Sequence, residues 1–399
     1  MSVPNISLRG EKMPSSPIRE LAAYADQAKA KGIHVYHLNI GQPDIPTPPE
    51  FYQAIHEHHA KVLEYGPSRG LGSFVDSLER YYHRQGLNHI EKEDILVTTG
   101  GSEAVLFLML AIASPGDEII VFDPIYTNYN GFAHMAGVKL VPVHTDAAKG
   151  YRMPDKDDIR KHVTSKTRAI LTCSPNNPTG MVHTHDDFAV LQELVLEHNL
   201  FLICDEVYRE FTYDSDHISV MSFFEMEQHV AMVDSLSKRY SVCGARIGCI
   251  VSKNQQLIHT VLKFGQARLC PPTLEQLAMQ TVVDVGDKYF IPMRETYRKR
   301  RDVLVNGLQA ISGVQCQTPP GAFYLMATLP VEDSSHFAKW LLSEFNVDNA
   351  TAMIAPGAGF YASPGLGQNE VRIAYVINTR AIIKAIEIIQ KGLEAYPGK

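Results

Sequence analysis

The chain of 399 residues lacks several features that would narrow its class at once. It has no uninterrupted apolar run long enough for a transmembrane helix, so the sequence predicts no membrane span. Its N-terminal stretch lacks the apolar core of a signal peptide. It also lacks a C-x-x-C pair, and several of its six scattered cysteines lie in apolar runs. That usage is typical of reduced core thiols in a cytoplasmic protein.

Positive charge is also in short supply, because the formal net charge is -7. A chain of this sign is a poor candidate for general binding to nucleic acid or to an anionic membrane. Apolar residues make up 45% of the chain and charged residues 20%, both ordinary for a globular protein. The length suits one large domain with a smaller one. We therefore expect neither nucleic acid nor a membrane among its partners.

Short β-rich runs alternate with helical stretches through the middle of the chain. Seven candidate strands cover 94–98, 118–122, 139–143, 168–173, 200–204, 231–235 and 247–251. Several of them are apolar throughout, which is typical of strands covered on both faces. Helical patterns at 102–113 and 185–198 lie between them. The alternation predicts an α/β fold with a mostly parallel sheet, in which ligands collect at the strand ends.

The pattern changes after about residue 290. A charged segment at 294–311 predicts a long helix, and a smaller α+β region follows, with strands within 323–329 and 370–376. We therefore expect a large domain over residues 46–290. The smaller domain should consist of residues 291–399 together with residues 1–45.

Two glycines follow the first candidate strand, in the stretch TTGGSEAV. Gly100 and Gly101 let the backbone come close to a ligand, and the N–H groups of Gly101 and Ser102 would face an anion as they open the next helix. The stretch is therefore either a phosphate cradle or an ordinary strand-to-helix turn with Ser102 as the N-cap.

Polar side chains also follow two later strands. Asn177, in SPNNPTG, lies in a rigid turn, where it either completes the turn alone or also hydrogen-bonds a ligand. Asp205 ends an apolar strand, either as a helix N-cap or as a buried acid that meets a cation. Against a ring nitrogen, this carboxylate would keep the nitrogen protonated. Tyr208 follows three residues later, on the same side of a turn.

The stretch SLSKRY places Lys238 directly after another apolar strand. It is either part of a loop or a partly desolvated amine, whose lowered pKa would suit a Schiff-base nucleophile. Arg246 opens the next strand and could reach the same phosphate. Arg372 lies within the β-pattern NEVRIAYV. There it binds either a ligand carboxylate or an acidic partner within the protein.

Taken together, these motifs resemble the class I pyridoxal-phosphate-dependent aminotransferases, the aspartate aminotransferase-like family of fold type I. The resemblance covers nearly the whole chain, in the order GQPD, YGPSRG, TTGGSEA, NNPTG, DEVY, SLSK, GARIG and a late arginine in a strand. It implies a large domain that binds pyridoxal 5′-phosphate and a smaller α+β domain. It also implies an aminotransferase that works by a ping-pong mechanism.

The resemblance assigns roles residue by residue. Lys238 matches the lysine that forms the internal aldimine and moves the proton, Asp205 the acid paired with the pyridine nitrogen, and Tyr208 the phenol bonded to the cofactor's 3′ oxygen. Asn177 matches the amide that contacts the same oxygen and the substrate carboxylate. Tyr126 matches the aromatic residue that stacks on the cofactor ring. The residues that match phosphate ligands are Gly100, Gly101, Ser102, Ser235, Ser237 and Arg246.

Three further residues match positions around the substrate or the neighbouring subunit. Arg372 matches the arginine that binds the substrate α-carboxylate, and Gly41 the backbone that closes over it. Tyr65 matches a tyrosine that reaches the phosphate of the neighbouring subunit. The resemblance therefore implies a homodimer with shared active sites.

Fewer residues bear on the substrate side chain. Ser102 stands where one aspartate-specific branch has a lysine. Arg268, shortly before two prolines, resembles an arginine that another branch supplies from the partner subunit to bind a distal carboxylate; the alternative for Arg268 is a surface or dimer-interface salt bridge. Arg19, in the N-terminal segment, is a second candidate for the distal carboxylate. We expect aspartate and 2-oxoglutarate as the substrate pair. The alternatives are an aromatic or broad-specificity aminotransferase and a pyridoxal-phosphate-dependent β-lyase of the same fold.

Two other classes fit the sequence poorly. A transcription regulator with an aminotransferase-like domain would need a DNA-binding module before GQPD. We expect none, because the segment there is short and the net charge of the chain is negative. A metal enzyme would need a ligand set. The histidine clusters IHEHHAK (His56, His58, His59) and VHTHDD (His183, His185) lack the spacing of an H-E-x-x-H site. We expect these side chains to be solvated and to bind no metal.

Overall fold

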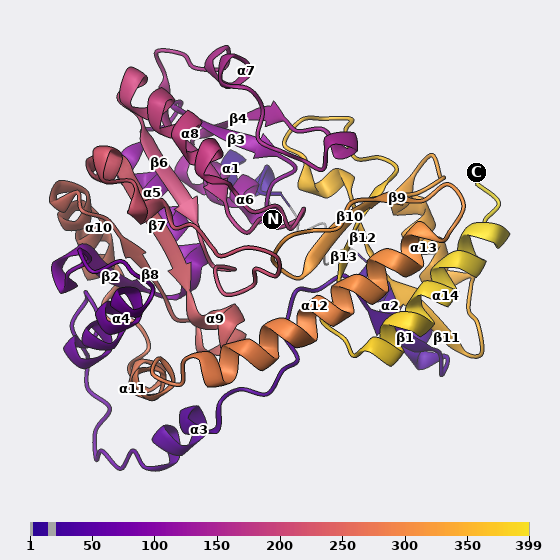
Figure 1. Ribbon diagram of the computed structural model, residues 1–399, viewed down its shortest axis with the longest axis horizontal. Coiled ribbons are helices and arrows are strands. Elements are labelled where there is room, and N and C mark those ends of the chain that lie inside the picture. Colours follow the sequence, from indigo (N-terminus) through magenta and orange to yellow (C-terminus); the bar gives the residue numbers. More distant parts are fainter. Residues whose placement is uncertain (1–2, 15–20, 399) are drawn as a thin grey trace.

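The computed structural model describes residues 3–14 and 21–398. The long helix α12 (Asp287–Gln309) runs diagonally across Figure 1, from a large region of sheet and helix to a smaller one. The seven-stranded sheet lies on the left of this view and the smaller sheets on the right. Helix α12 spans the domain boundary expected at residue 290.

The large sheet has the strand order β2-β8-β7-β6-β5-β3-β4. Its strands are β2 (Ile95–Thr98), β3 (Glu118–Asp123), β4 (Lys139–His144), β5 (Thr167–Cys173), β6 (Phe201–Asp205), β7 (Val230–Ser235) and β8 (Gly248–Val251). The neighbours from β4 to β7 are parallel, and β8 is antiparallel to both β7 and β2. All seven candidate strands are therefore confirmed, as is the mostly parallel sheet.

Helices cover both faces of this sheet, because its strands are apolar on both faces; every residue of β3 and β7 is buried. One face packs on α5 (Gly100–Ile112), α6 (Asn128–Ala136) and α10 (Gln255–Arg268). The other packs on α4 (Gly72–Arg84), α8 (His185–His198) and α11 (Thr273–Val282). Short helices α1 (Leu8–Glu11), α3 (Pro49–His56), α7 (Lys156–Arg160) and α9 (Leu236–Arg239) lie between these elements in sequence or before them.

Local sequence explains the ends of α8, which occupies the range predicted for it. Thr184 is the N-cap: its hydroxyl accepts from the Asp187 N–H at 3.2 Å, and the Asp187 carboxylate accepts from the Thr184 N–H at 2.7 Å. This reciprocal pair is a capping box. Asn199 ends the helix with a φ of 51°, a left-handed conformation that asparagine adopts more readily than most residues.

The second region mixes helices and strands, as predicted. Strands β10 (Tyr324–Thr328) and β13 (Glu370–Ala374) pair antiparallel, between β12 (Ala355–Pro356) and β9 (Gln315–Cys316). Strand β1 (His34–His37) pairs with β11 (Ala350–Met353), so a segment near the N-terminus lies beside the late part of the chain. Helices α2 (Ala22–Ala30), α13 (Ser334–Ser343) and α14 (Thr379–Ala395) complete this region (Figure 1).

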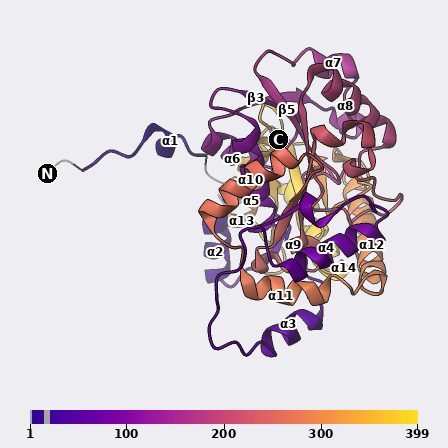
Figure 2. The same ribbon diagram turned by 90° about the vertical axis from the view of Figure 1, so that its left-hand side faces the viewer.

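The described N-terminal residues around α1 extend away from the rest of the molecule in Figure 2. The arm touches α6, where His134 Nε2 lies 2.7 Å from the Arg9 carbonyl oxygen. Val3, Ile6 and Leu8 on the arm are exposed. Within residues 3–14 and 21–398, none of the helices combines the length and the apolar character needed to cross a bilayer.

Candidate active site

A cavity of about 650 Å³ opens where β6 and β7 end and β13 of the smaller region approaches. The carboxyl ends of parallel strands are the usual place for ligands in such sheets. Twelve of the candidate site residues line this cavity: Gly41, Gly101, Ser102, Tyr126, Asn177, Asp205, Tyr208, Ser235, Ser237, Lys238, Arg246 and Arg372. The structure thus brings together residues that lie more than 300 positions apart in the sequence.

One end of the cavity is built from backbone that comes unusually close together. Gly100 opens α5 with a φ of 78°, and a Cβ there would lie 2.5 Å from Nη2 of Arg246. A Cβ on Gly248, in the neighbouring strand, would lie 2.7 Å from the carbonyl carbon of Gly100. Only glycine fits at either position. The N-terminus of α5 and its free N–H groups therefore face a space that suits an anion.

Hydroxyl and guanidinium donors line the same end. The Ser235 hydroxyl accepts from the Ser237 N–H at 3.3 Å and donates to the Ser237 hydroxyl at 2.9 Å. Arg246 has a φ of 56°, a left-handed conformation that is rare for arginine, and its Nη1 donates to the Cys243 carbonyl at 3.0 Å. Backbone strain of this kind persists at sites where the surrounding structure fixes a side chain. The donor set fits a phosphate group.

Lys238 lies in the short helix α9, directly after β7. Its Nζ donates to the Gly41 carbonyl at 2.9 Å and lies 3.7 Å from Sγ of Cys243. Burial lowers the pKa of Lys238; Cys243 acts against this shift, and the positive charges of Arg372 and Arg246 add to it. A larger share of the amine is then unprotonated near neutral pH, as a nucleophile or a base requires.

Asp205 is the last residue of β6. Burial raises its pKa to about 6, although hydrogen bonds from Tyr129 and from the Val207 N–H act in the opposite direction. The Tyr129 hydroxyl donates to Oδ2 at 2.7 Å, and the Val207 N–H donates to Oδ1 at 3.2 Å. A cation placed against this carboxylate would lower its pKa again and be held protonated itself. The sequence reasoning did not find Tyr129.

A second tyrosine that the sequence reasoning missed is Tyr324, in β10. Its hydroxyl lies 2.8 Å from that of Tyr208, and both side chains are buried. A Cβ on Gly41 would lie 1.6 Å from the Tyr324 hydroxyl, so position 41 has no room for a side chain. Burial raises the pKa of both phenols, which keeps them protonated as hydrogen-bond donors.

Arg372, in β13, is buried in the opposite wall. Its Nη1 donates to Oδ1 of Asn177 at 2.9 Å and its Nη2 to the Asn39 carbonyl, both neutral oxygens. Its guanidinium carbon lies 4.5 Å from the Tyr324 ring centroid and 4.7 Å from that of Phe360. Within the described part of the chain, its Nε is buried without a hydrogen-bond partner. The internal salt bridge considered above is therefore not seen there, and the arrangement suits a carboxylate ligand.

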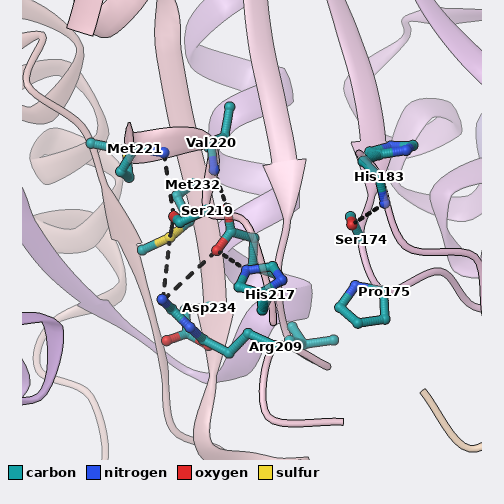
Figure 3. Close-up of polar contacts among 12 residues, drawn as sticks. Ser174, Pro175, His183, Arg209, His217, Ser219, Val220, Met221, Met232 and Asp234 are labelled. Carbon is teal, nitrogen blue, oxygen red and sulfur yellow. Dashed lines mark hydrogen bonds and ion pairs between the residues drawn. The ribbon is translucent and has the colours of Figure 1, made fainter. Parts of the chain in front are cut away.

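A polar network surrounds Glu206, the residue after Asp205, behind the cavity. Glu206 accepts from the Ser219 hydroxyl at 3.1 Å and the Val220 N–H at 2.7 Å, and its carboxylate lies 2.8 Å from Nε2 of His217 and 3.8 Å from Nη1 of Arg209. Figure 3 shows the four partners Arg209, His217, Ser219 and Val220 close together in this network. Burial alone would raise the pKa of Glu206, but the charge and hydrogen bond of His217, together with Arg209, hold it below the ordinary value.

Three candidate residues in the described part of the chain do not line the cavity: Tyr65, Arg268 and Gly100. Tyr65 is 82% exposed. Arg268 forms an ion pair with Glu103, with Nη2 and Oε2 3.1 Å apart. Arg19 lies outside the described residues. Gly100 contributes through its backbone at the cavity's edge rather than as a lining residue.

Two of the histidines expected to be solvated, His58 and His183, are only partly exposed. His183 is half-buried, and its Nε2 lies 2.6 Å from the Thr172 hydroxyl, so the expectation of a solvated side chain is wrong for it. Burial lowers the pKa of His183 to about 4. Its backbone N–H donates to the Ser174 hydroxyl at 2.9 Å (Figure 3). Sequence spacing gave no sign of this because the partners come from a neighbouring strand and turn.

Comparisons with known proteins agree with this architecture. Residues 33–389 match the family of class I and II aminotransferases. The aspartate/prephenate aminotransferase of Thermus thermophilus is 30% identical over 388 residues, 96% of this chain and 97% of that protein. The solved aspartate aminotransferase of Thermotoga maritima has a TM-score of 0.89 at 27% identity, covering 98% of this chain and 100% of that one. The alanine aminotransferase of Pyrococcus furiosus has a TM-score of 0.87 at 27% identity, with the same coverage.

The fold and the cavity define an α/β enzyme that acts on small molecules between two regions of one chain. More particularly, the chain belongs to the class I and II aminotransferases, which transfer amino groups between small amino and oxo acids. The predicted family, the fold type and the enzymatic character are thereby confirmed. Pyridoxal phosphate is the cofactor of this family.

Proposed function

We propose that this chain binds pyridoxal 5′-phosphate in the cavity and moves an amino group from an L-amino acid to a 2-oxo acid in a ping-pong cycle. Aspartate and 2-oxoglutarate are the proposed pair. One observation carries the proposal: a desolvated lysine shares a single cavity with a buried carboxylate, an anion-binding helix end and a buried arginine that has no acidic partner among the described residues.

The residues that would hold the cofactor fall into three groups. Ser102, Ser235, Ser237 and Arg246, with the backbone of the two glycines, would bind its phosphate. Asp205 would pair with the ring nitrogen and Tyr208 with the 3′ oxygen, while Tyr126 would cover the ring face. When bound, pyridoxal phosphate supplies an electrophilic carbon for the amine and a ring that takes up negative charge from the substrate Cα.

The chain's own side chains would perform the remaining work. Arg372 binds the substrate α-carboxylate, which would satisfy the guanidinium. Lys238 removes the proton from the substrate Cα, since its lowered pKa leaves part of the amine free to act as a base. Asp205 remains ionised against the protonated ring nitrogen. Several side chains of the cavity walls are buried, including Asp205 and Arg372, which strengthens their electrostatic interactions.

We also propose a homodimer in the cytoplasm. Tyr65 is exposed outside its own cavity, as expected for a residue that serves a second copy. The N-terminal arm in Figure 2 carries exposed Val3, Ile6 and Leu8, an unusual cost for a monomer in water. All six cysteines are free, which fits a reducing compartment. If light scattering shows a monomer and the assay shows that this monomer is fully active, the shared active site is contradicted.

A specific observation favours a second candidate for the substrate. Among the described lining residues, the cations are Lys238, Arg246 and Arg372, and each already has a role in the proposal. A distal carboxylate would then need a cation from the partner subunit or from the N-terminal segment that holds Arg19. An aromatic or broad-specificity enzyme needs none, and the likeness to an alanine aminotransferase is as extensive as that to an aspartate aminotransferase.

The test is a half-reaction. The purified holoenzyme is mixed with one amino acid at a time, without an oxo acid, while the visible absorbance of the bound cofactor is followed. Rapid change with aspartate and glutamate alone supports the acidic pair. Rapid change with aromatic or small neutral amino acids moves the enzyme to the second candidate. Release of ammonia with an oxo acid identifies a β-lyase, and no change with any amino acid contradicts amino transfer.

A further inference from the structure

We propose that Arg268 is a positioning residue for the phosphate-binding end of the cavity. Arg268 holds Glu103 in place, and Glu103 in turn fixes the backbone of residues 99–102, here called the α5 turn. In this role Arg268 does not contact the substrate. The inference rests on the proposed binding of pyridoxal phosphate. It gives a role to an ion pair that joins the end of α10 to the beginning of α5, 165 positions apart in the sequence.

The contact between the two side chains is bidentate. Nε of Arg268 donates to Oε1 of Glu103 at 3.2 Å, and Nη2 lies 3.1 Å from Oε2. Nη2 also donates to the Val97 carbonyl at 3.2 Å, and Nη1 to the Leu269 carbonyl at 2.7 Å. The guanidinium is therefore fixed to both β2 and α5, the two elements that the α5 turn connects. A lysine could not make this set of contacts, because it lacks the planar fork.

Glu103 passes the constraint to the turn itself. Its Oε2 also accepts from the Thr99 N–H at 2.8 Å, at the first residue of the turn. The next residue, Gly100, lies against the guanidinium of Arg246, where a Cβ would come within 2.5 Å. A displaced turn would therefore change both the backbone donors of α5 and the place of a cavity-lining arginine.

The ion pair also neutralises a negative charge near the proposed phosphate site. Glu103 directly follows Ser102, so an unpaired carboxylate there would repel a dianionic phosphate. Arg268 compensates this charge in a partly buried setting, since the side chains of Arg268 and Glu103 are 17% and 16% exposed. Each also sits at the helix end that favours its sign: the arginine ends α10 and the glutamate begins α5.

The same contacts argue against substrate binding by this arginine. Its Nε, Nη1 and Nη2 all donate within the chain. A substrate carboxylate would have to displace Glu103 and leave that acid uncompensated. The positioning role needs no such exchange.

The experiment compares the affinity of the apoenzyme for pyridoxal phosphate, measured by absorbance titration, across four variants. We expect Arg268→Ala to weaken binding about tenfold, the scale of one charge-assisted hydrogen bond. Glu103→Gln should weaken it less. The double variant R268A/E103Q should bind more tightly than R268A alone, because the uncompensated acid is gone. Arg298→Ala, which removes an exposed ion pair with Glu295 on α12, is the matched control and should leave the affinity unchanged.

The ratio of kcat/KM for aspartate to that for alanine separates the two roles. A positioning residue leaves this ratio unchanged in all four variants. Unchanged cofactor affinity in R268A, together with a lost preference for aspartate in R268A but not in E103Q, would overturn the proposal. If R268A fails to fold, Arg268→Lys replaces it; a several-fold weaker affinity supports the role and an unchanged affinity contradicts it. Failure of the unmodified chain to bind pyridoxal phosphate would instead refute the proposed function.

Discussion

Asp205 and Glu206 are neighbours in sequence and both are buried, yet their pKa values shift in opposite directions. Burial raises the pKa of Asp205 to about 6. Burial acts on Glu206 too, but His217 and Arg209 hold its pKa below the ordinary value. The acid behind the cavity has its partners within the protein, whereas the acid facing the cavity lacks a cationic one among the described residues. A buried carboxylate without a cationic partner, at the wall of a cavity, is a candidate to bind a cationic ligand group.

Lys238 and Arg239 repeat the contrast one strand away. Arg239 is buried behind the cavity, where its Nη2 donates to Oδ2 of Asp234 at 2.5 Å and its Nη1 to the Tyr81 hydroxyl at 2.6 Å. Lys238 faces the cavity and donates to a neutral backbone oxygen, that of Gly41. Substitutions behind the cavity should therefore lower the stability of the protein, whereas substitutions in the cavity should lower its activity.

Lys238→Ala tests the cavity side with the largest expected effect. Loss of the proposed nucleophile and base together should lower kcat by at least about 10⁴-fold. Steady-state assays with aspartate and 2-oxoglutarate measure this loss, and the unfolding temperature serves as the control, because a cavity residue should leave it within a few degrees. Activity within tenfold of the unmodified enzyme would remove Lys238 from the chemistry.

Glu206→Gln tests the back of the site. It leaves buried Arg209 and His217 without their acid, so the free energy of unfolding should fall by about 3–5 kcal/mol. Chemical denaturation of the apoenzyme measures the change, beside Glu295→Gln, which removes an exposed pair on α12 and should cost less than about 1 kcal/mol. Equal effects of the two substitutions would show that the network does not stabilise the fold.

Asp205→Asn should stabilise the apoenzyme, in contrast to Glu206→Gln. Because burial raises the pKa of Asp205 from 3.8 to about 6, the folded state binds more protons than the unfolded state between these values, and stability falls as the pH rises through this window. At pH 8 the ionised group costs about 3 kcal/mol, which asparagine removes. Apoenzyme unfolding should therefore show stabilisation at pH 8 and little change at pH 4, while activity falls. Equal effects at the two pH values would contradict this account.

Tyr129→Phe gives the smallest expected effect and sharpens the comparison. It removes the hydroxyl that donates to Asp205, so the pKa of Asp205 should rise further and activity should fall up to about tenfold. The pH profile of kcat/KM is the measurement, and its acidic limb should move to higher pH. Tyr240→Phe is the control, because the Tyr240 hydroxyl is buried without a partner among the described residues. A shift of similar size in both variants would argue for general loosening.

The sequence predicts more of the fold than of the site's supporting residues. Apolar runs such as β3 and β7 are local patterns, so all seven large-sheet strands could be found from them. Lys238, Asp205 and Arg372 follow or lie in such runs and carry motifs. Tyr129 lies 76 positions from the carboxylate that it contacts, and no spacing rule joins two residues that meet through sheet order.

The partner of Arg268 and the role of Tyr324 could not be predicted for related reasons. Arg268 stood close to a Pro-Pro pair, and the motif suggested a substrate role, while its contact with Glu103 spans 165 positions. Tyr324 lies in an apolar strand pattern, which predicts that its side chain belongs to the hydrophobic core. Its hydroxyl faces Tyr208 because β10 meets the turn after β6. Alternation along a strand fixes which face a side chain takes, but it does not reveal what lies opposite.

The attachment of the GQPD segment has a geometric consequence. Asp44 is held by Arg300 of α12 through two contacts, of 2.6 and 2.9 Å, and β1 pairs with β11, so Gly41 travels with the region that carries Arg372. Lys238 and Asp205 belong to the other region. In the proposed binding mode, the α-carboxylate of the substrate would lie against Arg372 of one region and its Cα–H bond against Lys238 of the other. The angle between the two regions would then set the alignment of the bond to be broken with the amine that takes the proton.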